Sequence, residues 1–418
     1  MSDVEVEVCL DVGAGTVAVV GRLFLRRKRG AESATFRYED DWIGDPQGYA
    51  IDPQLPLRSG SFHTGVDQQL FRAFADLAPD RWGVELALRY ERRRADQDGE
   101  TPRSLGEADF LLAVRDQLRQ GALRLRNPAR GTFLAPNGGG VPHLVDLPRL
   151  LGASTKLEDD VETDAELRLL LDAGSSLGGA RPKAHVTDSG KLFIAKFPRP
   201  TRDAWSVIVW EQIALEMAAA GGIVVSPSCL VDVAGHAVLL VERFDRADGH
   251  QRIGYVSALT MLEARDNDRR SYTEIAEVIE TTSPQTTKDL RELWRRVAFS
   301  ILISNADDHL RNHGFLRVGP GWILSPAFDL NPAPDAVGFL STAIETPRDR
   351  RADIALLVNW AEYFRVTDPA GELRRLLAAT DTWRERAKHY GVASETARLA
   401  PAFEHEQRDV ARRIVASS

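Results

Sequence analysis

The stretch that decides the fold is Ile303-Ser-Asn-Ala-Asp-Asp-His-Leu-Arg-Asn-His-Gly314, followed closely by Leu324-Ser-Pro-Ala-Phe-Asp329. Within it, Asp307 and Asn312 have the D-x-x-x-x-N spacing of phosphoryl-transfer enzymes, in which a carboxylate orients an acceptor hydroxyl and an amide binds Mg²⁺. Asp329 follows where a second metal-binding carboxylate is expected. The spacing selects Asp307 over its equally acidic neighbour Asp308. The pattern therefore predicts phosphoryl transfer.

Two further polar residues of this loop are candidates for the same site. His309 could be a general base or a metal ligand, but a histidine that follows a core helix more often holds a loop in place. Arg311 could neutralise charge on the γ-phosphate in the transition state, or it could simply pair with Asp308. We assign His309 and Arg311 to the residues that contact ATP.

A glycine-containing loop precedes an expected β-hairpin in the N-terminal half. Backbone N–H groups around Gly178, Gly179 and Ala180 can approach phosphate oxygens closely, and the hydroxyl of Ser176 adjoins them. The loop has neither the Walker nor the Rossmann spacing, so it is weak evidence alone. It becomes a candidate phosphate site because of the residues that follow it.

Those residues are a lysine, a glutamate and a charged connector. Lys196 ends an apolar strand, from which it would reach the α and β phosphates of ATP. Glu211 shares the apolar face of the next helix, so it should point inward and pair with a cation, for which Lys196 is the natural candidate. The apolar strand 237–241 then opens into the connector Glu242-Arg-Phe-Asp-Arg246. Such a connector at a domain boundary is where a kinase would bind adenine.

The length and the hydrophobic patterning indicate several domains. The chain has 418 residues, of which 43% are hydrophobic and 27% charged, as in an ordinary globular protein. Strand-like alternation dominates residues 1–60 and nearly disappears beyond about residue 250. We expect an α+β protein with an α/β N-terminal part, which includes a small antiparallel-sheet subdomain, and an all-helical C-terminal lobe. The expected domains are residues 1–100, 101–247 and 248–418.

Charge and cysteine content exclude several classes of protein. No apolar run approaches the roughly 20 residues that span a bilayer, and the alternating start reads as an edge strand, so we expect a cytoplasmic protein. Cys9 and Cys229 lie far apart in strand-like contexts, which excludes a disulfide framework and predicts two buried thiols. The net charge of −8 argues against direct DNA binding by this chain.

The motifs together resemble the HipA family of serine/threonine kinase toxins. The stretches that carry the resemblance are Pro79–Gly83, Ser176–Lys183, Ile194–Pro198, Glu242–Arg246, Asn305–Gly314 and Ser325–Asp329. The resemblance covers nearly the whole chain and implies a HipA-like kinase fold that binds ATP and Mg²⁺. It implies that Asp307 is the catalytic aspartate and that Asn312 and Asp329 are the magnesium ligands.

The same resemblance implies further roles. Lys196 would be the ATP lysine, and Glu242, Phe244 and Asp245 would form the adenine and ribose region. Ser176 would be the autophosphorylated loop serine whose modification displaces the loop and inactivates the kinase, although Ser175 beside it leaves the acceptor open.

The expected partners also follow from the resemblance. They are a HipB-like helix-turn-helix antitoxin that brings the kinase to operator DNA, and a protein substrate such as an aminoacyl-tRNA synthetase. The sequence departs from the usual patterns at Asp308, which replaces a small residue, and in Phe-Asp-Leu330, which replaces Phe-Asp-Gly. Two alternatives remain open, namely an aminoglycoside-type small-molecule phosphotransferase and a pseudokinase that acts as a corepressor. The two intact carboxylates disfavour the pseudokinase.

Overall fold

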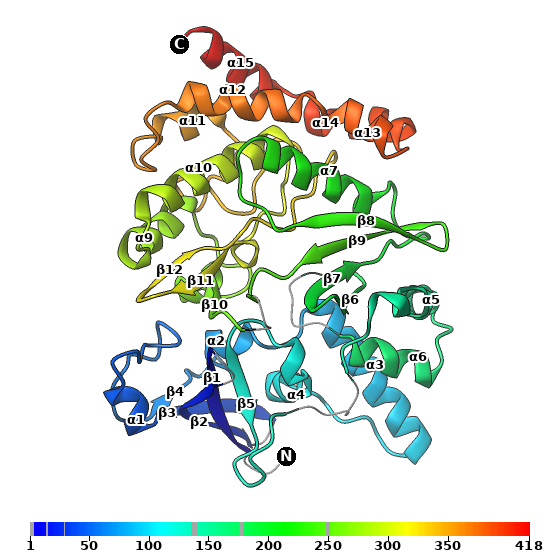
Figure 1. The fold of residues 1–418 in the computed structure, drawn as a ribbon, viewed down its shortest axis with the longest axis vertical. Helices are drawn as coiled ribbons and strands as arrows, with labels where there is room; N and C mark the ends of the chain where they lie inside the picture. Colours follow the sequence, from blue (N-terminus) through cyan, green and yellow to red (C-terminus); the bar gives the residue numbers. More distant parts are fainter. Residues whose placement is uncertain are drawn as a thin grey trace. The chain divides into compact units, whose positions relative to one another are not determined.

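The computed structural model divides into two compact units (Figure 1). It describes residues 4–13, 16–28, 30–134, 140–174, 179, 181–247 and 251–418. The first unit comprises Met1–Pro200, Asp232–His236 and Glu242–Val256, and the second comprises Thr201–Val231, Ala237–Val241 and Ser257–Ser418. The chain therefore passes between the units at residue 200, within the strands around residues 232–242 and again at residues 256–257, rather than at a single linker.

A five-stranded antiparallel sheet forms the N-terminal part of the first unit. Its strands are β1 (Val4–Gly13), β2 (Thr16–Lys28), β3 (Ala31–Tyr38), β4 (Phe62–His63) and β5 (Leu123–Arg126), in the order β4-β3-β2-β1-β5. Alternate residues such as Val8, Leu23 and Phe36 are completely buried, as a sheet with one covered face requires. Strand β1 is not the expected edge strand, because β5 pairs with its other side from beyond residue 100.

Helices and a second hairpin complete the first unit. They are α1 (Asp40–Gly44), α2 (Arg72–Ala75), α3 (Arg81–Asp98), α4 (Glu107–Ala113), α5 (Leu147–Glu158) and α6 (Asp164–Asp172), with strands β6 (Lys183–Asp188) and β7 (Lys191–Lys196). The β6–β7 turn is the expected one: Ser189 and Gly190 have φ values of 47° and 78°, as a two-residue type I′ turn requires. In this register Lys196 lies opposite Lys183.

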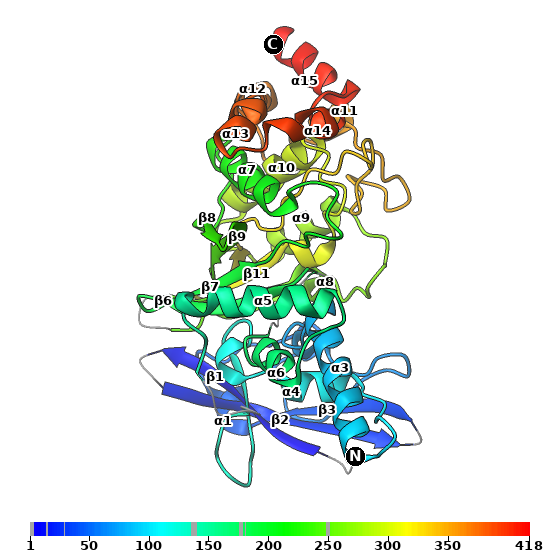
Figure 2. The same ribbon diagram turned by 90° about the vertical axis from the view of Figure 1, so that its right-hand side faces the viewer.

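The second unit is mostly helical and also contains short β-strands (Figure 2). Its elements are α7 (Val207–Ala220), α8 (Ala258–Met261), α9 (Tyr272–Thr282), α10 (Thr286–Leu302), β11 (Gly314–Val318), β12 (Gly321–Leu324), α11 (Ile354–Asn359), α12 (Pro369–Thr380), α13 (Trp383–His389), α14 (Thr396–Phe403) and α15 (Glu406–Ala416). Strands β8 (Ser228–Val233), β9 (His236–Glu242) and β10 (Tyr255–Ser257) cross the boundary between the units. Helix α10 is its central element, because Leu293, Trp294 and Val297 are completely buried.

The observed elements confirm the predicted mixture of helices and antiparallel strands. The C-terminal part is mostly helical, as expected, and it also contains the β11–β12 hairpin, whose strands have only four to five residues each. Cys9 is buried as expected, but Cys229 is exposed. None of the described helices has the length and apolar composition needed to cross a membrane.

Candidate active site

Helix α10 delivers the D-x-x-x-x-N loop and separates its two acids. The helix ends at Leu302, and Ser304 takes a left-handed φ of 54°, which turns the chain sharply out of the helix. Beyond this turn Asp307 is exposed, whereas only 3% of Asp308 is exposed. The two neighbouring carboxylates therefore have different environments and cannot exchange roles without rearranging the loop.

Asp308 is the buried anchor of the loop. Its Oδ2 accepts hydrogen bonds from the Tyr272 hydroxyl at 2.6 Å and the Ser300 hydroxyl at 3.2 Å, and its Oδ1 lies 3.0 Å from His313 Nε2. Burial works to raise the pKa of Asp308, but the neighbouring His313 and these hydrogen bonds together hold the pKa below its ordinary value. Burial and the adjacent carboxylate raise the pKa of Tyr272 well above its ordinary value. Asp308 is therefore engaged on both oxygens, and Asp307 is the acid at the surface.

Asn312 and Asp329 supply the oxygen ligands that Mg²⁺ prefers. The Asn312 Nδ2 donates to the backbone oxygen of Asp307 at 3.0 Å, which fixes the amide and leaves its Oδ1 as the group that can bind a cation. Asp329 has a φ of 58°, a conformation that costs a non-glycine residue about 1–3 kcal/mol. Such strain concentrates at functional sites, so the donor set and the backbone both fit a magnesium site. Among the described residues, no group of three or more His, Cys, Asp or Glu side chains could hold a metal ion.

A chain of amides connects Asp329 to the catalytic loop. Asn331 Nδ2 donates to Asp329 Oδ1 at 3.4 Å, and the Asn331 backbone N–H donates to Asn305 Oδ1 at 3.3 Å. Asn305 Nδ2 then donates to the Ser300 hydroxyl at 3.3 Å, the same hydroxyl that binds Asp308. Asn305 and Asn331 were not predicted as site residues, and only their amide side chains next to acidic motif residues could have indicated them.

The two other loop candidates have defined contacts. Arg311 makes a bidentate ion pair with Asp266, at 2.9 and 3.0 Å, and this contact corrects the alternative that it pairs with Asp308. The His309 backbone N–H donates to Asp307 O at 2.9 Å, and no hydrogen-bond partner for its buried Nδ1 lies in the described part of the chain. The contacts of both residues with ATP stay predictions.

Residues of the C-terminal helices form hydrogen bonds with the chain just before the D-x-x-x-x-N loop. Arg408 of α15, which is 1% exposed, donates to the backbone oxygen of Leu302 at 3.0 Å and to the Thr380 hydroxyl at 2.9 Å, and it also pairs with Asp381. The Ser304 hydroxyl donates to Ala402 O at 3.3 Å. Burial lowers the pKa of Arg408. No local sequence pattern indicated this role, because an arginine on an amphipathic helix usually faces solvent.

The first unit contains the residues predicted to contact the nucleotide. Lys196 ends β7 as expected. Lys183 opposite it is buried and pairs with Asp80 at 2.5 Å, and Trp82 donates to its backbone oxygen at 3.2 Å. Gly179 has a φ of 118°, which favours glycine. The remaining loop predictions, Ser175, Ser176, Gly178 and Ala180, lie outside the described residues.

The predicted adenine connector is held from within the first unit. Asp245 is buried and binds Arg243 at 2.6 Å, Arg246 at 2.7 Å and the backbone N–H of Gly121 at 2.7 Å. Burial would raise its pKa, but the two arginines hold the pKa well below its ordinary range. Its carboxylate thus fixes the connector, a role that the sequence did not predict, and its ribose contact stays a prediction.

Glu242 and Phe244 are the other connector residues predicted to contact the nucleotide, and Glu211 is the predicted partner of Lys196. Glu242 pairs with Lys191 at 2.8 Å, and the Phe244 ring centroid lies 6.0 Å from that of Tyr255. Glu211 lies on α7 and is 1% exposed, which confirms that it points inward. Its pairing with Lys196 stays a prediction.

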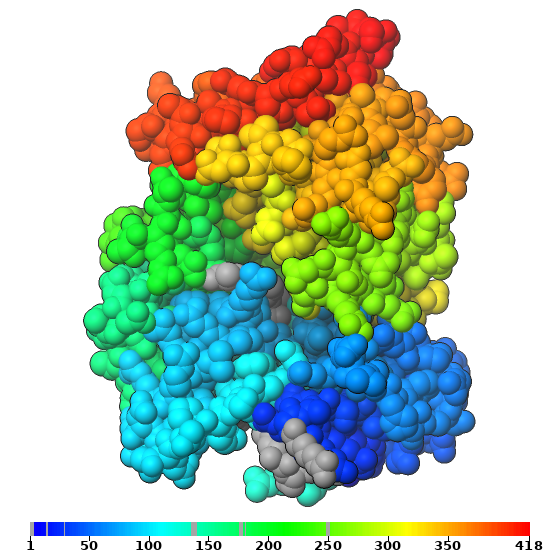
Figure 3. Space-filling view, turned by 180° about the vertical axis from the view of Figure 1, so that it is seen from behind, coloured from blue at the N-terminus to red at the C-terminus, as the bar shows by residue number. Residues whose placement is uncertain are grey.

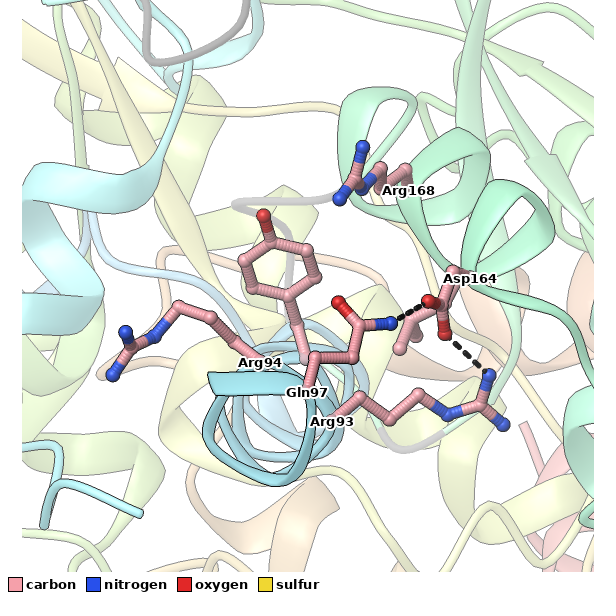
Figure 4. Close-up of a pocket in the computed structure, with 7 residues that line it drawn as sticks. Arg93, Arg94, Gln97, Asp164 and Arg168 are labelled. Carbon is pink, nitrogen blue, oxygen red and sulfur yellow. Dashed lines mark hydrogen bonds and ion pairs between the residues drawn. The ribbon is translucent and has the colours of Figure 1, made fainter. Parts of the chain in front are cut away.

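A pocket in the first unit lies elsewhere. It opens between α3 and α6 (Figure 4), and Tyr90, Arg93, Arg94, Gln97, Asp164, Leu167 and Arg168 line it. Asp164 accepts hydrogen bonds from Arg93 at 2.9 Å and from Gln97. None of the predicted site residues lines this pocket. Its carboxylate, Asp164, is already hydrogen-bonded to Arg93 and Gln97, which also line the pocket. We therefore assign it no part in phosphoryl transfer.

Two protein-family models match this chain. The model of the HipA-like C-terminal domain matches residues 175–412, and the model of the HipA N-terminal domain matches residues 12–107. Toxin YjjJ of Escherichia coli (strain K12) is 28% identical over 193 residues, which are 42% of this chain and 43% of that protein. The chain thus spans less than half the length of this curated relative.

A similar solved structure shows the fold that this chain shares. The Shewanella oneidensis MR-1 HipA in a complex with HipB and operator DNA aligns over 98% of this chain and 96% of its own, with a TM-score of 0.63 and 17% sequence identity. The Helicobacter pylori proinflammatory kinase CtkA aligns over 58% of this chain and 94% of its own, with a TM-score of only 0.42 and 16% identity. The first alignment shows a shared fold across almost the full chain.

Proposed function

This chain belongs to the HipA family, and on that premise we propose that it is an ATP-dependent serine/threonine protein kinase that acts as the toxin of a toxin–antitoxin pair. One observation carries the proposal: the loop buries Asp308 as an anchor and leaves the adjacent Asp307 exposed, with the Asn312 amide bound to the Asp307 backbone. An exposed carboxylate on a rigid loop, next to oriented oxygen ligands, is what in-line phosphoryl transfer requires.

In this mechanism the protein mainly positions the reacting groups. Asp307 accepts a hydrogen bond from the serine or threonine hydroxyl and aims its oxygen at the γ-phosphorus of ATP. A bond forms from that oxygen to phosphorus, the bond to the ADP oxygen breaks, and Asp307 receives the hydroxyl proton. We assign the ATP phosphates to Lys196 and to the Gly178–Gly179 backbone. Asn312 and Asp329 would hold Mg²⁺, which when bound neutralises phosphate charge.

Incubation with Mg-ATP should add phosphate to the glycine loop of this protein, at Ser176 or at Ser175. A phosphate there adds about −1.5 to −2 charges where the ATP phosphates must lie, so the modified enzyme should lose activity. Mass spectrometry with phosphosite mapping measures this, with the Asp307→Asn protein as the control that should stay unmodified. Phosphate on neither serine in an active enzyme would exclude the switch, whereas no transfer to any acceptor would exclude the kinase.

We also propose a cytosolic protein as the acceptor, and an aminoacyl-tRNA synthetase is our first candidate. The family membership supports a protein acceptor, and an arrested synthetase would explain toxicity. Label transfer from γ-labelled ATP to a panel of purified synthetases tests the candidate. If a different protein in a cell extract is labelled and no synthetase is, that protein becomes the candidate acceptor in place of the synthetase.

The proposed partner is a HipB-like antitoxin with a helix-turn-helix domain. The related Shewanella HipA was solved with HipB and operator DNA, and the net charge of −8 on this chain disfavours tight DNA binding on its own. We expect expression of this chain alone to arrest growth and coexpression with the antitoxin to restore it. Growth curves measure both effects, and the Asp307→Asn chain should be harmless in either case. Harmless overexpression of the active, unmodified kinase would contradict the toxin assignment.

A further inference from the structure

A hairpin that follows Asp329 is hydrogen-bonded to the loop that carries Asp307, and it presents an exposed phenylalanine and two exposed arginines. We propose that this hairpin, residues 338–352, is the docking surface for an acidic, apolar-containing segment of the protein that receives the phosphoryl group. We call it the Phe339 hairpin. The proposal rests on the proposed kinase function and names the chemistry of its substrate.

The stretch just after the first strand of the hairpin is bound directly to the catalytic loop. The backbone N–H and the hydroxyl of Ser341 both donate to Ala306 O, at 2.9 and 2.8 Å, and the Thr342 hydroxyl donates to Asp308 O at 2.8 Å. The two accepting carbonyls belong to the residues on either side of Asp307. Residues 341–342 therefore run alongside the proposed acceptor position.

Phe339 is held close to that position. Consecutive Cα atoms are about 3.8 Å apart, so the Cα of Phe339 lies within about 7.6 Å of that of Ser341. Gly338–Leu340 pairs with Arg350–Ala352, through the hydrogen bonds from Leu340 N to Arg350 O at 2.8 Å and from Ala352 N to Gly338 O at 2.9 Å. Figure 3 shows this part of the second unit, gold to orange, on the face seen from behind. An acceptor chain at Asp307 is thus within side-chain reach of Phe339.

The exposure of Phe339 suits a docking residue. Phe339 is 61% exposed, whereas the neighbouring Leu340 is 2% exposed. A single exposed apolar residue is ordinary on a protein surface. This one differs because paired backbone holds it near a proposed catalytic residue, and aromatic residues, phenylalanine included, are enriched at protein–protein interfaces.

The charges of the hairpin indicate the chemistry of its partner. Its two acids are engaged: Asp349 binds Arg351 at 2.6 Å, and Glu345 accepts a hydrogen bond from the Trp360 indole at 3.3 Å. Arg348 and Arg350 are exposed, and neither has an ion-pair partner within the described ranges of the chain. With three arginines and two carboxylates, residues 338–352 carry a net charge of +1 on a protein of net charge −8, and this local positive site attracts carboxylates.

Peptide phosphorylation tests this surface. A library of peptides with one fixed serine and varied flanking residues, γ-labelled ATP and the full chain would report the preferred neighbours of the acceptor. The variants are Phe339→Ser and Arg348→Glu/Arg350→Glu. The matched control is Arg374→Glu, which changes an exposed arginine on α12.

We expect wild type and the control to prefer aspartate or glutamate together with a large apolar residue. Phe339→Ser should lower kcat/KM for the apolar-containing peptides by about tenfold or more, the usual effect of losing an aromatic anchor. The arginine double variant should reverse the preference from glutamate to lysine, and the KM for ATP should stay unchanged in all variants.

Three results would overturn the docking surface while leaving the kinase intact. The first is that all variants show the same peptide preferences. The second is that the wild-type enzyme phosphorylates itself but none of the peptides. The third is that the protein binds a labelled oligonucleotide and the same variants weaken that binding. The proposed function fails separately, by the absence of any phosphoryl transfer from wild type.

Discussion

Replacing Asp307 with asparagine is expected to lower phosphoryl transfer by a factor of about 10² to 10⁴, the usual contribution of a positioned general base. The affinity for ATP should change by no more than a few-fold, because Asp307 orients the acceptor and not the nucleotide. Asp329→Asn should instead weaken Mg-ATP binding as well as transfer. Nucleotide titration combined with single-turnover transfer assays measures both variants.

A control for surface acids is available in the same segment. Asp335 is exposed and pairs with Arg398 at 2.7 Å, so Asp335→Asn should retain the activity of wild type. An active Asp307→Asn enzyme would contradict the assignment. The catalytic role would then have to pass to Asp308, whose carboxylate is buried, and the loop would have to open for each turnover.

Removing the Asp308 carboxylate should lower the free energy of unfolding of the protein and not only its activity. Asp308→Ala leaves the buried hydroxyls of Tyr272 and Ser300 without their acceptor, and each buried polar group left unpaired costs about 1–3 kcal/mol. Chemical denaturation of wild type and variant measures the loss in the free energy of unfolding. Asp307→Ala is the matched comparison, since it removes the adjacent but exposed carboxylate and should cost far less.

The contribution of Asp308 to the stability of the fold should decrease at low pH. The fold lowers the pKa of Asp308, so its stabilising contribution is complete above the unfolded value of about 3.9 and is lost as pH falls from there through the folded pKa. Wild type should therefore lose more stability on acidification below about pH 4 than Asp308→Asn does. Equal acid sensitivity of the two proteins would show that the carboxylate is not the group that titrates.

Local patterns in the sequence predicted the parts of the site that depend on neighbours along the chain. The helix before the loop, the turn at Ser189–Gly190 and the strand that ends at Lys196 all follow from hydrophobic period and turn chemistry. The D-x-x-x-x-N spacing also distinguished Asp307 from Asp308, and the structure shows a physical difference between them. Their catalytic roles stay predictions.

Long-range contacts could not be predicted in this way. Strand β5 joins the N-terminal sheet from beyond residue 100, Arg408 reaches the end of α10, and Asp245 is fixed by two arginines and Gly121. Each contact depends on which distant segment packs nearby, and one sequence carries no local signal for that choice. The exposed Cys229 was missed for the same reason, since its strand pattern resembles a buried one.

The attachment of the catalytic loop to α14 and α15 sets an order of events during synthesis. Arg408 lies 106 residues after the Leu302 carbonyl that it binds, and Ala402 lies 98 residues after Ser304. At about 5–20 residues per second, a ribosome needs about 5–20 s to cover that distance. In a growing chain, the hydrogen bonds from Arg408 to Leu302 and from Ser304 to Ala402 cannot form until this time has passed. In a toxin family, translation itself thus separates the appearance of the predicted catalytic residues from the completion of the contacts that hold their loop.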